Sequence, residues 1–147
     1  MNEISCVLPN LYLSGKCFAD DKAIHDKYNI RSIINVDDRC VNFFENDNEY
    51  TYFVIKEIDS PSTDLKKYFQ SSTEFIQREI SLGKSVLVHC AAGVSRSATI
   101  VLAYLMGVEK MSLDDALEFL QDKRSVVQPN IGFHIQLMEF EKELNNK

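Results

Sequence analysis

The sequence lacks any long tract of proline, glycine or serine, and its 147 residues include only three prolines and five glycines. Charged residues of both signs are interspersed along it and make up 26% of the total. A disordered tail or flexible linker is therefore not expected as a major part of the chain. Because 45% of the residues are hydrophobic, the chain can bury one core, and we expect a single domain over residues 1–147.

An excess of positive charge is also missing, since the formal net charge at pH 7 is -6. General affinity for nucleic-acid backbones or anionic membranes needs lysine and arginine in excess on one face. We therefore expect neither nucleic acid nor membrane as a partner. No apolar run approaches the ~20 residues of a membrane span, and no signal-peptide, myristoylation or prenylation pattern is present. We expect a soluble protein of the cytoplasm, with the nucleus as a second location.

Closely spaced cysteines are absent as well, which argues against a zinc site or a redox pair. The four cysteines are Cys6, Cys17, Cys40 and Cys90. A disulfide scaffold is not expected in a chain with so large a core, and we expect no bound metal. The first three are interpreted as small hydrophobic side chains. Cys90 is different because of the residues around it.

What the sequence does contain is an alternation of β-rich and helical patterns. We expect a strand pair over residues 7–13, strands at 32–36, 52–55 and 85–89, and helices at 16–27, 65–82, 96–106, 112–125 and from 130 onward. The strands at 32–36 and 52–55 are both interpreted as central. This order predicts an α/β fold with a central, mainly parallel, twisted sheet flanked by helices. In such folds ligands bind beyond the carboxyl ends of the strands.

The most informative segment joins the apolar strand at 85–89 to the following helix through five mostly small residues. Successive backbone N–H groups of such a loop can form a nest for an anion, above the positive end of the helix. Gly93 lets the backbone turn there. Arg96 adds a planar fork that can hold two phosphate oxygens. The predicted phosphate-binding residues are Ala91, Ala92, Gly93, Val94, Ser95 and Arg96.

A helix N-terminus and a neighbouring cation also stabilise a thiolate, because they lower the pKa of a cysteine thiol by several units. We therefore expect Cys90 to be a thiolate at neutral pH. Held at the base of a phosphate cradle, this sulfur could attack phosphorus and form a thiophosphoryl intermediate. Cys90 and Arg96 are thus the predicted nucleophile and phosphate clamp, with His89 orienting the loop.

The segment 89–97, His-Cys-x5-Arg-Ser, resembles the signature of the protein tyrosine phosphatase superfamily. Residues 8–15, 88–99, 103–106 and 128–133 resemble the dual-specificity phosphatases within it, so the resemblance covers nearly the whole chain. It implies cofactor-free hydrolysis of phosphotyrosine, phosphoserine and phosphothreonine through a cysteinyl-phosphate intermediate. It also implies a phosphorylated protein as substrate, such as a signalling kinase. We expect the protein to act as a monomer.

A general acid is needed to protonate the leaving oxygen, and a carboxyl group does this well. Asp59 follows a strand end, at a place where the related phosphatases have their acid aspartate. Asp64 and Glu57 lie in the same short segment and are the competing candidates. A turn role for Asp59 in Asp-Ser-Pro is the simpler alternative.

Three further residues are candidates for supporting roles, each with a structural alternative. By resemblance Ser97 would hydrogen-bond the sulfur and so help it to leave the phosphoenzyme, or it begins a helix. Asn130 could reach the active-site loop, although opening the last helix is sufficient reason for its presence. Asn35 could brace loops from below.

Two other functions are compatible with a phosphate cradle. A phosphopeptide-binding module would use it without turnover, but inactive relatives typically lack the cysteine. A phosphatase for a non-protein phosphate, such as a phosphoinositide, an RNA 5′-triphosphate or a phosphoglucan, would need added charge in the loop. Lipid-directed relatives usually place lysine there, and the loop at 91–95 has none. Sulfur transfer and arsenate reduction are disfavoured because their usual domain order differs.

Overall fold

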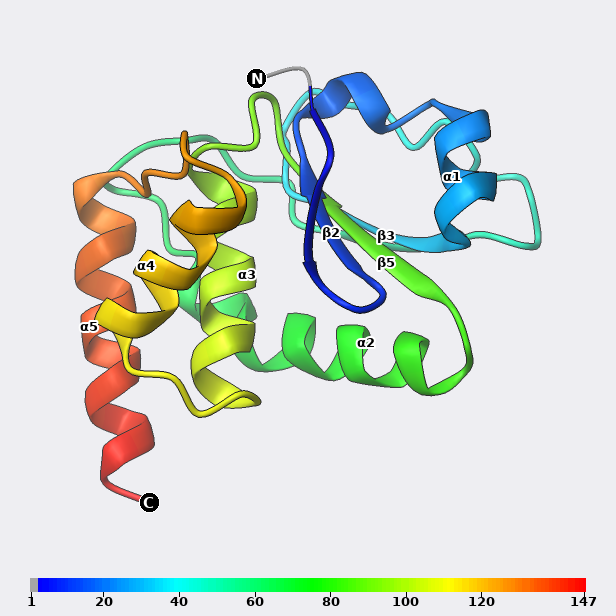
Figure 1. The fold of residues 1–147 in the computed structure, drawn as a ribbon. Coiled ribbons are helices and arrows are strands. Elements are labelled where there is room, and N and C mark those ends of the chain that lie inside the picture. Colours follow the sequence, from blue (N-terminus) through cyan, green and yellow to red (C-terminus); the bar gives the residue numbers. More distant parts are fainter. Residues whose placement is uncertain (1–2) are drawn as a thin grey trace.

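Five strands form one sheet in the computed structural model, which describes residues 3–147 (Figure 1). The order across the sheet is β1-β2-β5-β3-β4, and only the β1–β2 pair is antiparallel. The expected α/β class with a mainly parallel sheet is therefore confirmed. The strands are β1 (Ser5–Leu8), β2 (Leu11–Ser14), β3 (Ile30–Asn35), β4 (Thr51–Val54) and β5 (Ser85–His89).

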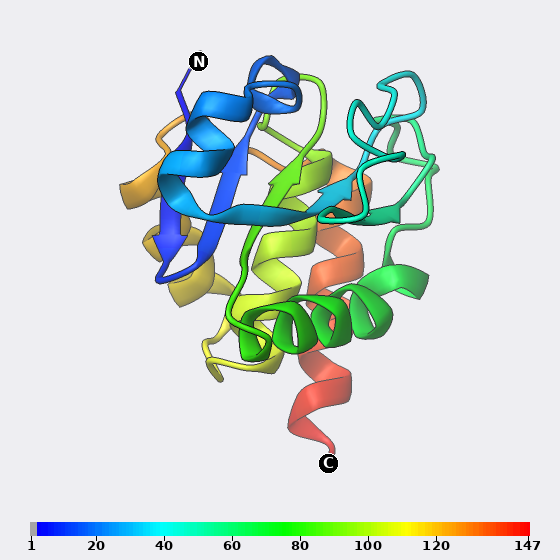
Figure 2. The same cartoon turned by 90° about the vertical axis from the view of Figure 1, so that its right-hand side faces the viewer.

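Helices cover both faces of this sheet, and α1 lies on the face opposite α2 and α3 (Figure 2). The alternation of side chains along β5 explains the two cores, because Val86 and Val88 point to one face and Leu87 to the other. The larger core lies between the sheet and α2–α5. The helices are α1 (Lys22–Tyr28), α2 (Phe69–Ser81), α3 (Arg96–Gly107), α4 (Leu113–Lys123) and α5 (Ile131–Asn145), with 3-10 turns η1 (Lys16–Phe18) and η2 (Lys66–Tyr68).

The first expected helix begins later than the pattern predicts. Residues 16–18 form only a 3-10 turn, and α1 starts after Asp21, whose carboxylate accepts a hydrogen bond from the Ile24 backbone N–H. The preceding segment is held differently, because the Lys16 backbone N–H donates to the carbonyl of Ala91 at 3.1 Å. The start of this segment is thereby tied to the loop after β5, and the helix begins only at its N-cap.

The expectation that 52–55 is a central strand is wrong, because β4 pairs only with β3 and ends the sheet. The side chain of Val54 is accordingly exposed. β5 has the central position, between β2 and β3, and all five of its residues are buried. The carboxyl end of β5, at His89, therefore lies between the carboxyl ends of β2 and β3.

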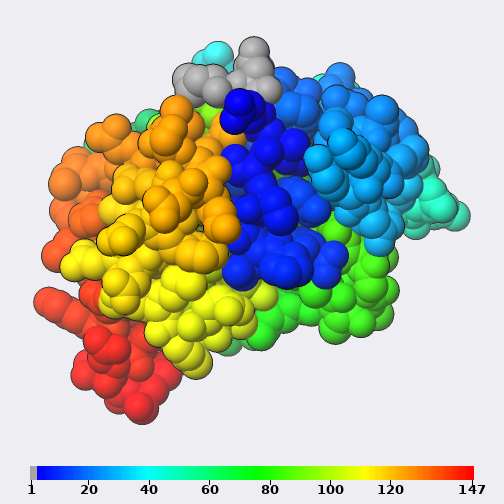
Figure 3. Space-filling model, in the orientation of Figure 1, coloured from blue at the N-terminus to red at the C-terminus, as the bar shows by residue number. Residues whose placement is uncertain are grey.

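The space-filling view shows the β1–β2 hairpin packed directly beside the α4 region (Figure 3). This contact brings the end of α4 near the N-terminal strand and the loop after β5, a neighbourhood that becomes important for the site. Over residues 3–147, no helix has both the length and the apolar character of a membrane span.

Candidate active site

The loop between β5 and α3 turns at Gly93, as the sequence predicts. Gly93 lies at φ +69°, in the left-handed region that glycine adopts without strain. A Cβ atom at this position would lie 2.6 Å from the carbonyl carbon of Ser14 and 2.7 Å from a guanidinium nitrogen of Arg124. Both the backbone turn and the close packing therefore require glycine.

The sulfur of Cys90 lies at the base of this loop, and the residue is 2% exposed. Its Sγ accepts a hydrogen bond from the Gly93 backbone N–H at 3.2 Å and lies 3.0 Å from the hydroxyl oxygen of Ser97. Ser97 was expected either to contact the sulfur or to begin the helix. It lies in the first turn of α3 and contacts the sulfur. Both groups can donate to a negatively charged sulfur.

Arg96 begins α3 and is almost completely buried. Its Nη1 donates to the carboxylates of Asp37 at 3.4 Å and Asp38 at 3.1 Å, and to the carbonyl of Glu57 at 2.9 Å. Its Nε is buried and has no hydrogen-bond partner among the described residues. One edge of the guanidinium is thus held in place while Nε keeps its donor for an anion in the loop.

The sequence patterns did not identify Asp37 and Asp38, which lie just after β3. Burial of the Asp38 carboxyl is the largest single effect on its pKa and raises it, but hydrogen bonds and the charge of Arg96 together lower the pKa below its ordinary value. Two adjacent acidic residues directly after a central strand were the available signal, because they meet β5 at the same edge of the sheet.

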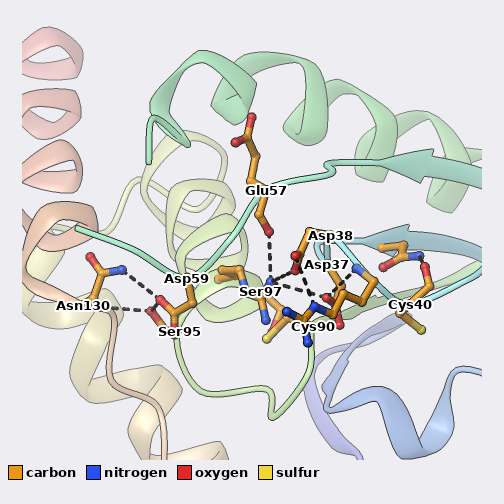
Figure 4. Close-up of polar contacts among 12 residues, drawn as sticks. Asp37, Asp38, Cys40, Glu57, Asp59, Cys90, Ser95, Ser97 and Asn130 are labelled. Atoms are coloured by element: carbon orange, nitrogen blue, oxygen red, sulfur yellow. Dashed lines mark hydrogen bonds and ion pairs between the residues drawn. The ribbon is translucent and has the colours of Figure 1, made fainter. Parts of the chain in front are cut away.

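Asp59 lies on the other side of Cys90 from Asp37 and Asp38 (Figure 4). Its carboxylate accepts hydrogen bonds from the Ser95 hydroxyl at 2.9 Å and from the Asn130 side-chain amide at 2.8 Å. The structure therefore places this carboxylate against the phosphate loop.

The two competing carboxylates are directed elsewhere. Glu57 accepts from the Tyr68 hydroxyl at 2.8 Å, and Asp64 accepts from the Lys67 backbone N–H at 3.3 Å. Neither carboxylate has a described hydrogen bond to the loop.

Asn130 has both of the roles considered for it. Its side-chain oxygen caps α5 by accepting from the Phe133 backbone N–H at 2.9 Å, while its amide nitrogen holds Asp59. Its own backbone N–H donates to the hydroxyl of Ser95 at 3.0 Å. The start of α5 is thereby connected to the loop and to the carboxylate at once.

Asn35 and His89 end the two neighbouring strands β3 and β5. The side chain of Asn35 donates to the carbonyl of Cys40 and to Asn42, so it braces the loop after its own strand. Burial lowers the pKa of His89 to about 4, although a hydrogen bond to the Cys90 backbone raises it. His89 is therefore neutral at physiological pH and adjoins the catalytic loop without adding charge.

Arg124 is a second cation at the loop, which the sequence reasoning did not identify. It follows α4 and is 5% exposed. Its Nε donates to the carbonyl of Gly93 at 2.9 Å and its Nη2 to the carbonyl of Ala92 at 3.1 Å. Nη1 donates to the carbonyl of Glu3 at 2.8 Å. By holding the carbonyls outward, Arg124 favours the arrangement in which the N–H groups of the loop face inward.

We expect Arg124→Met to lower kcat/KM for an aryl phosphate by about 10-fold to 100-fold, because the loop loses two charge-assisted hydrogen bonds and small displacements of a site are costly. Lys123→Met is the matched control, since the neighbouring Lys123 is exposed. Thermal unfolding of both variants shows whether the assay temperature is well below each Tm. Wild-type kcat/KM in a folded Arg124→Met protein would contradict this role.

The fold and the loop geometry together define the class of cysteine-based phosphatases, with a cysteine and an arginine at the two ends of a phosphate loop after a central strand. The chain belongs to the dual specificity phosphatase family: the model "Dual specificity phosphatase, catalytic domain" matches residues 11–143.

Known relatives agree with this assignment. Human dual specificity protein phosphatase 1 is 41% identical over 138 residues, which cover 94% of this chain and 37% of that protein. The chain thus spans little more than a third of the length of this curated relative. Among solved structures, DUSP15 has a TM-score of 0.89 at 32% identity, covering 100% of this chain and 97% of that chain. Human DUSP28 has a TM-score of 0.90 at 25% identity, covering 97% of this chain and 95% of that chain.

Proposed function

We propose that the protein is a dual-specificity phosphatase that hydrolyses phosphotyrosine, phosphoserine and phosphothreonine in proteins. The observation that supports this most directly is the position of the Cys90 sulfur, held by the Gly93 N–H and the Ser97 hydroxyl at the start of a loop that Arg96 closes. Membership of the dual specificity phosphatase family supports the same activity.

In the first step the thiolate of Cys90 attacks phosphorus, and an S–P bond forms as the bond from phosphorus to the leaving oxygen breaks. Arg96 and the N–H groups of the loop stabilise the charge on the transferring group. Asp59 gives its proton to the leaving oxygen. The products of this step are the dephosphorylated side chain and a cysteinyl-phosphate.

In the second step Asp59, now a carboxylate, takes a proton from water as the water oxygen attacks phosphorus. The S–P bond breaks, inorganic phosphate leaves, and the electron pair returns to the sulfur. A hydrogen bond from Ser97 stabilises the thiolate as a leaving group. The cycle balances without a cofactor or a metal.

Finer parts of the proposal rest on charge and family. We propose a phosphorylated signalling protein, such as a kinase, as substrate, and a monomer acting in the cytoplasm and the nucleus. The net charge of -6 disfavours nucleic acid and anionic membranes as partners. The neutral side chains at 91–95 favour a single phosphate group over a polyphosphorylated lipid head group.

The binding-only alternative is tested by assaying the wild-type protein with a small aryl phosphate and with a phosphopeptide. Release of inorganic phosphate from both supports the enzyme. Binding of the phosphopeptide with no release from either compound would show that the protein is a phosphopeptide-binding module.

Asp59→Asn tests the assignment of the acid. We expect kcat for an aryl phosphate with a poor leaving group to fall about 100-fold to 1,000-fold, because an amide cannot donate the required proton. Asp64→Asn is the matched control and should keep the wild-type rate. If Asp64→Asn lowers the rate and Asp59→Asn does not, the assignment to Asp59 is wrong.

A further inference from the structure

A hollow of about 430 Å³ lies next to the phosphate loop, between the segment after β2 and the segment after β3. No step of the proposed reaction uses it. Its lining residues are Lys16, Cys17, Asp20, Arg39, Cys40, Val41 and Phe43. We call it the flank hollow.

Both walls of the flank hollow are attached to the catalytic residues. On one side the Lys16 backbone N–H donates to the carbonyl of Ala91 in the phosphate loop at 3.1 Å. On the other side the Arg39 backbone N–H donates at 3.1 Å to Asp37, whose carboxylate also holds Arg96. Cys40 lies on the same wall, and its carbonyl accepts a hydrogen bond from the side chain of Asn35. The flank hollow is therefore held beside the loop by hydrogen bonds from both of its walls.

Apolar side chains form part of this surface and are exposed to solvent. Val41 is 62% exposed and Phe43 is 48% exposed, which is unusual for large hydrophobic residues close to each other. Burial raises the pKa of the Cys40 thiol, with Asp37 adding to the effect and Lys16 opposing it. The thiol is thus a neutral, weakly polar part of the wall, and it is close enough to Lys16 for that charge to affect its pKa.

The flank hollow also has two cations in a protein whose net charge is -6. The side chain of Lys16 is exposed and forms no described ion pair, and Arg39 lies 3.7 Å from Asp38 with its side chain 91% exposed. The acidic groups nearby are partly neutralised, because Asp37 and Asp38 both contact Arg96. Asp20 is the remaining acidic residue of the lining. The nearby charges therefore balance, and among the described residues Lys16 is the lining cation that has no ion pair.

We propose that the flank hollow binds the segment of a phosphoprotein substrate next to its phosphorylated residue, taking an apolar side chain that is adjacent to a carboxylate. This inference rests on the proposed phosphatase function and deepens it. An extended chain advances ~3.3 Å per residue, so a neighbour one to three residues from the phosphorylated side chain can reach a surface that adjoins the loop. An aryl phosphate has no such segment and uses the loop alone.

The test compares phosphopeptides that contain a Leu-Glu pair beside the phosphotyrosine, on its N-terminal or C-terminal side, with peptides that have Ser-Ser there. For wild type we expect kcat/KM to be about 10-fold higher for one of the two Leu-Glu peptides. Phe43→Ser should remove most of this preference, because the apolar contact is lost. Lys16→Ala should remove the part due to glutamate, measured with a Leu-Gln peptide. Both variants keep the backbone N–H groups that hold the loop.

Two matched control variants change exposed residues away from the flank hollow. Leu82→Ser changes an exposed leucine just before β5, and Lys27→Ala changes an exposed lysine of α1. Both should keep the peptide preference of wild type. All four variants should hydrolyse an aryl phosphate at the wild-type rate, which shows that the loop is intact.

The same peptides are also titrated by fluorescence anisotropy into Cys90→Ser protein with and without the surface substitutions. Equal affinity and equal kcat/KM for Leu-Glu and Ser-Ser peptides would overturn the inference about the flank hollow. Hydrolysis of the aryl phosphate would in that case still support the phosphatase function. Absence of hydrolysis with a preference in binding that Phe43→Ser removes would overturn the phosphatase function and support the flank hollow.

Discussion

We expect Cys90→Ser to lower kcat for phosphate release by about 10⁴-fold or more, with both aryl phosphate and phosphopeptide. Loss of the attacking group in covalent catalysis typically has an effect of this order or larger. The serine hydroxyl is a much weaker nucleophile than a thiolate, and Gly93 and Ser97 are placed to stabilise a negative sulfur. The measurement is a single-turnover assay with excess enzyme, which detects even slow formation of product.

Binding provides the control for this variant. The loop and Arg96 are unchanged, so Cys90→Ser should still bind a phosphopeptide, with an affinity within a few fold of the wild-type KM. Mass spectrometry of acid-quenched wild-type enzyme should find phosphate attached to Cys90. Phosphate release by Cys90→Ser at a rate near that of wild type would contradict the nucleophile assignment.

For Arg96→Ala we expect the second large effect, a fall in kcat/KM of about 10³-fold. The Arg96 guanidinium has a buried Nε with no partner among the described residues, and two lost charge-assisted hydrogen bonds to phosphate represent about 3–6 kcal/mol. Arg96→Lys keeps the charge but not the fork, so it should recover only a small part of the loss. Wild-type kcat/KM in Arg96→Lys would show that charge alone is sufficient.

Arg96→Ala should also destabilise the fold, since Asp37 is 5% exposed and would be left as a buried carboxylate without its cation. Breaking a buried pair by removing one partner costs about 3–5 kcal/mol. The double variant Arg96→Ala/Asp37→Asn removes the unpaired charge and should regain much of the Tm without regaining activity. Recovery of Tm together with activity would mean that Arg96 acts only through stability.

The secondary structure around Cys90 could be predicted almost completely from the sequence. An unbroken apolar strand, small loop residues and a following helix were adjacent in the chain, so Cys90, Gly93 and Arg96 could be placed from local pattern alone. The caps of α4 and α5, at Ser112 and Asn130, were readable for the same reason. Local signals failed for the first helix, where a hydrogen bond to a distant loop holds the start of the expected segment.

Strand order was decided only by the tertiary structure. Residues 52–55 have the composition of a central strand, yet β4 lies at the edge of the sheet. The residues of a strand do not specify how many neighbouring strands it has, so this position could not be predicted. Asp59 was the predicted acid, but Asp64 and Glu57 remained competitors because one short segment can present any of the three carboxylates. Asp59 differs from Asp64 and Glu57 in its contacts with Ser95 and Asn130, and Asn130 is far away in the chain.

The amino-acid sequence by itself thus determined the loop that carries Cys90 and Arg96, the proposed nucleophile and clamp, because its physical causes lie within one strand–loop–helix segment. The tertiary structure decided what surrounds that loop: Asp37 and Asp38 on Arg96, Arg124 beneath the carbonyls, and the flank hollow beside it. These contacts join segments that are distant in sequence, and they depend on how parallel strands bring their carboxyl ends to one edge.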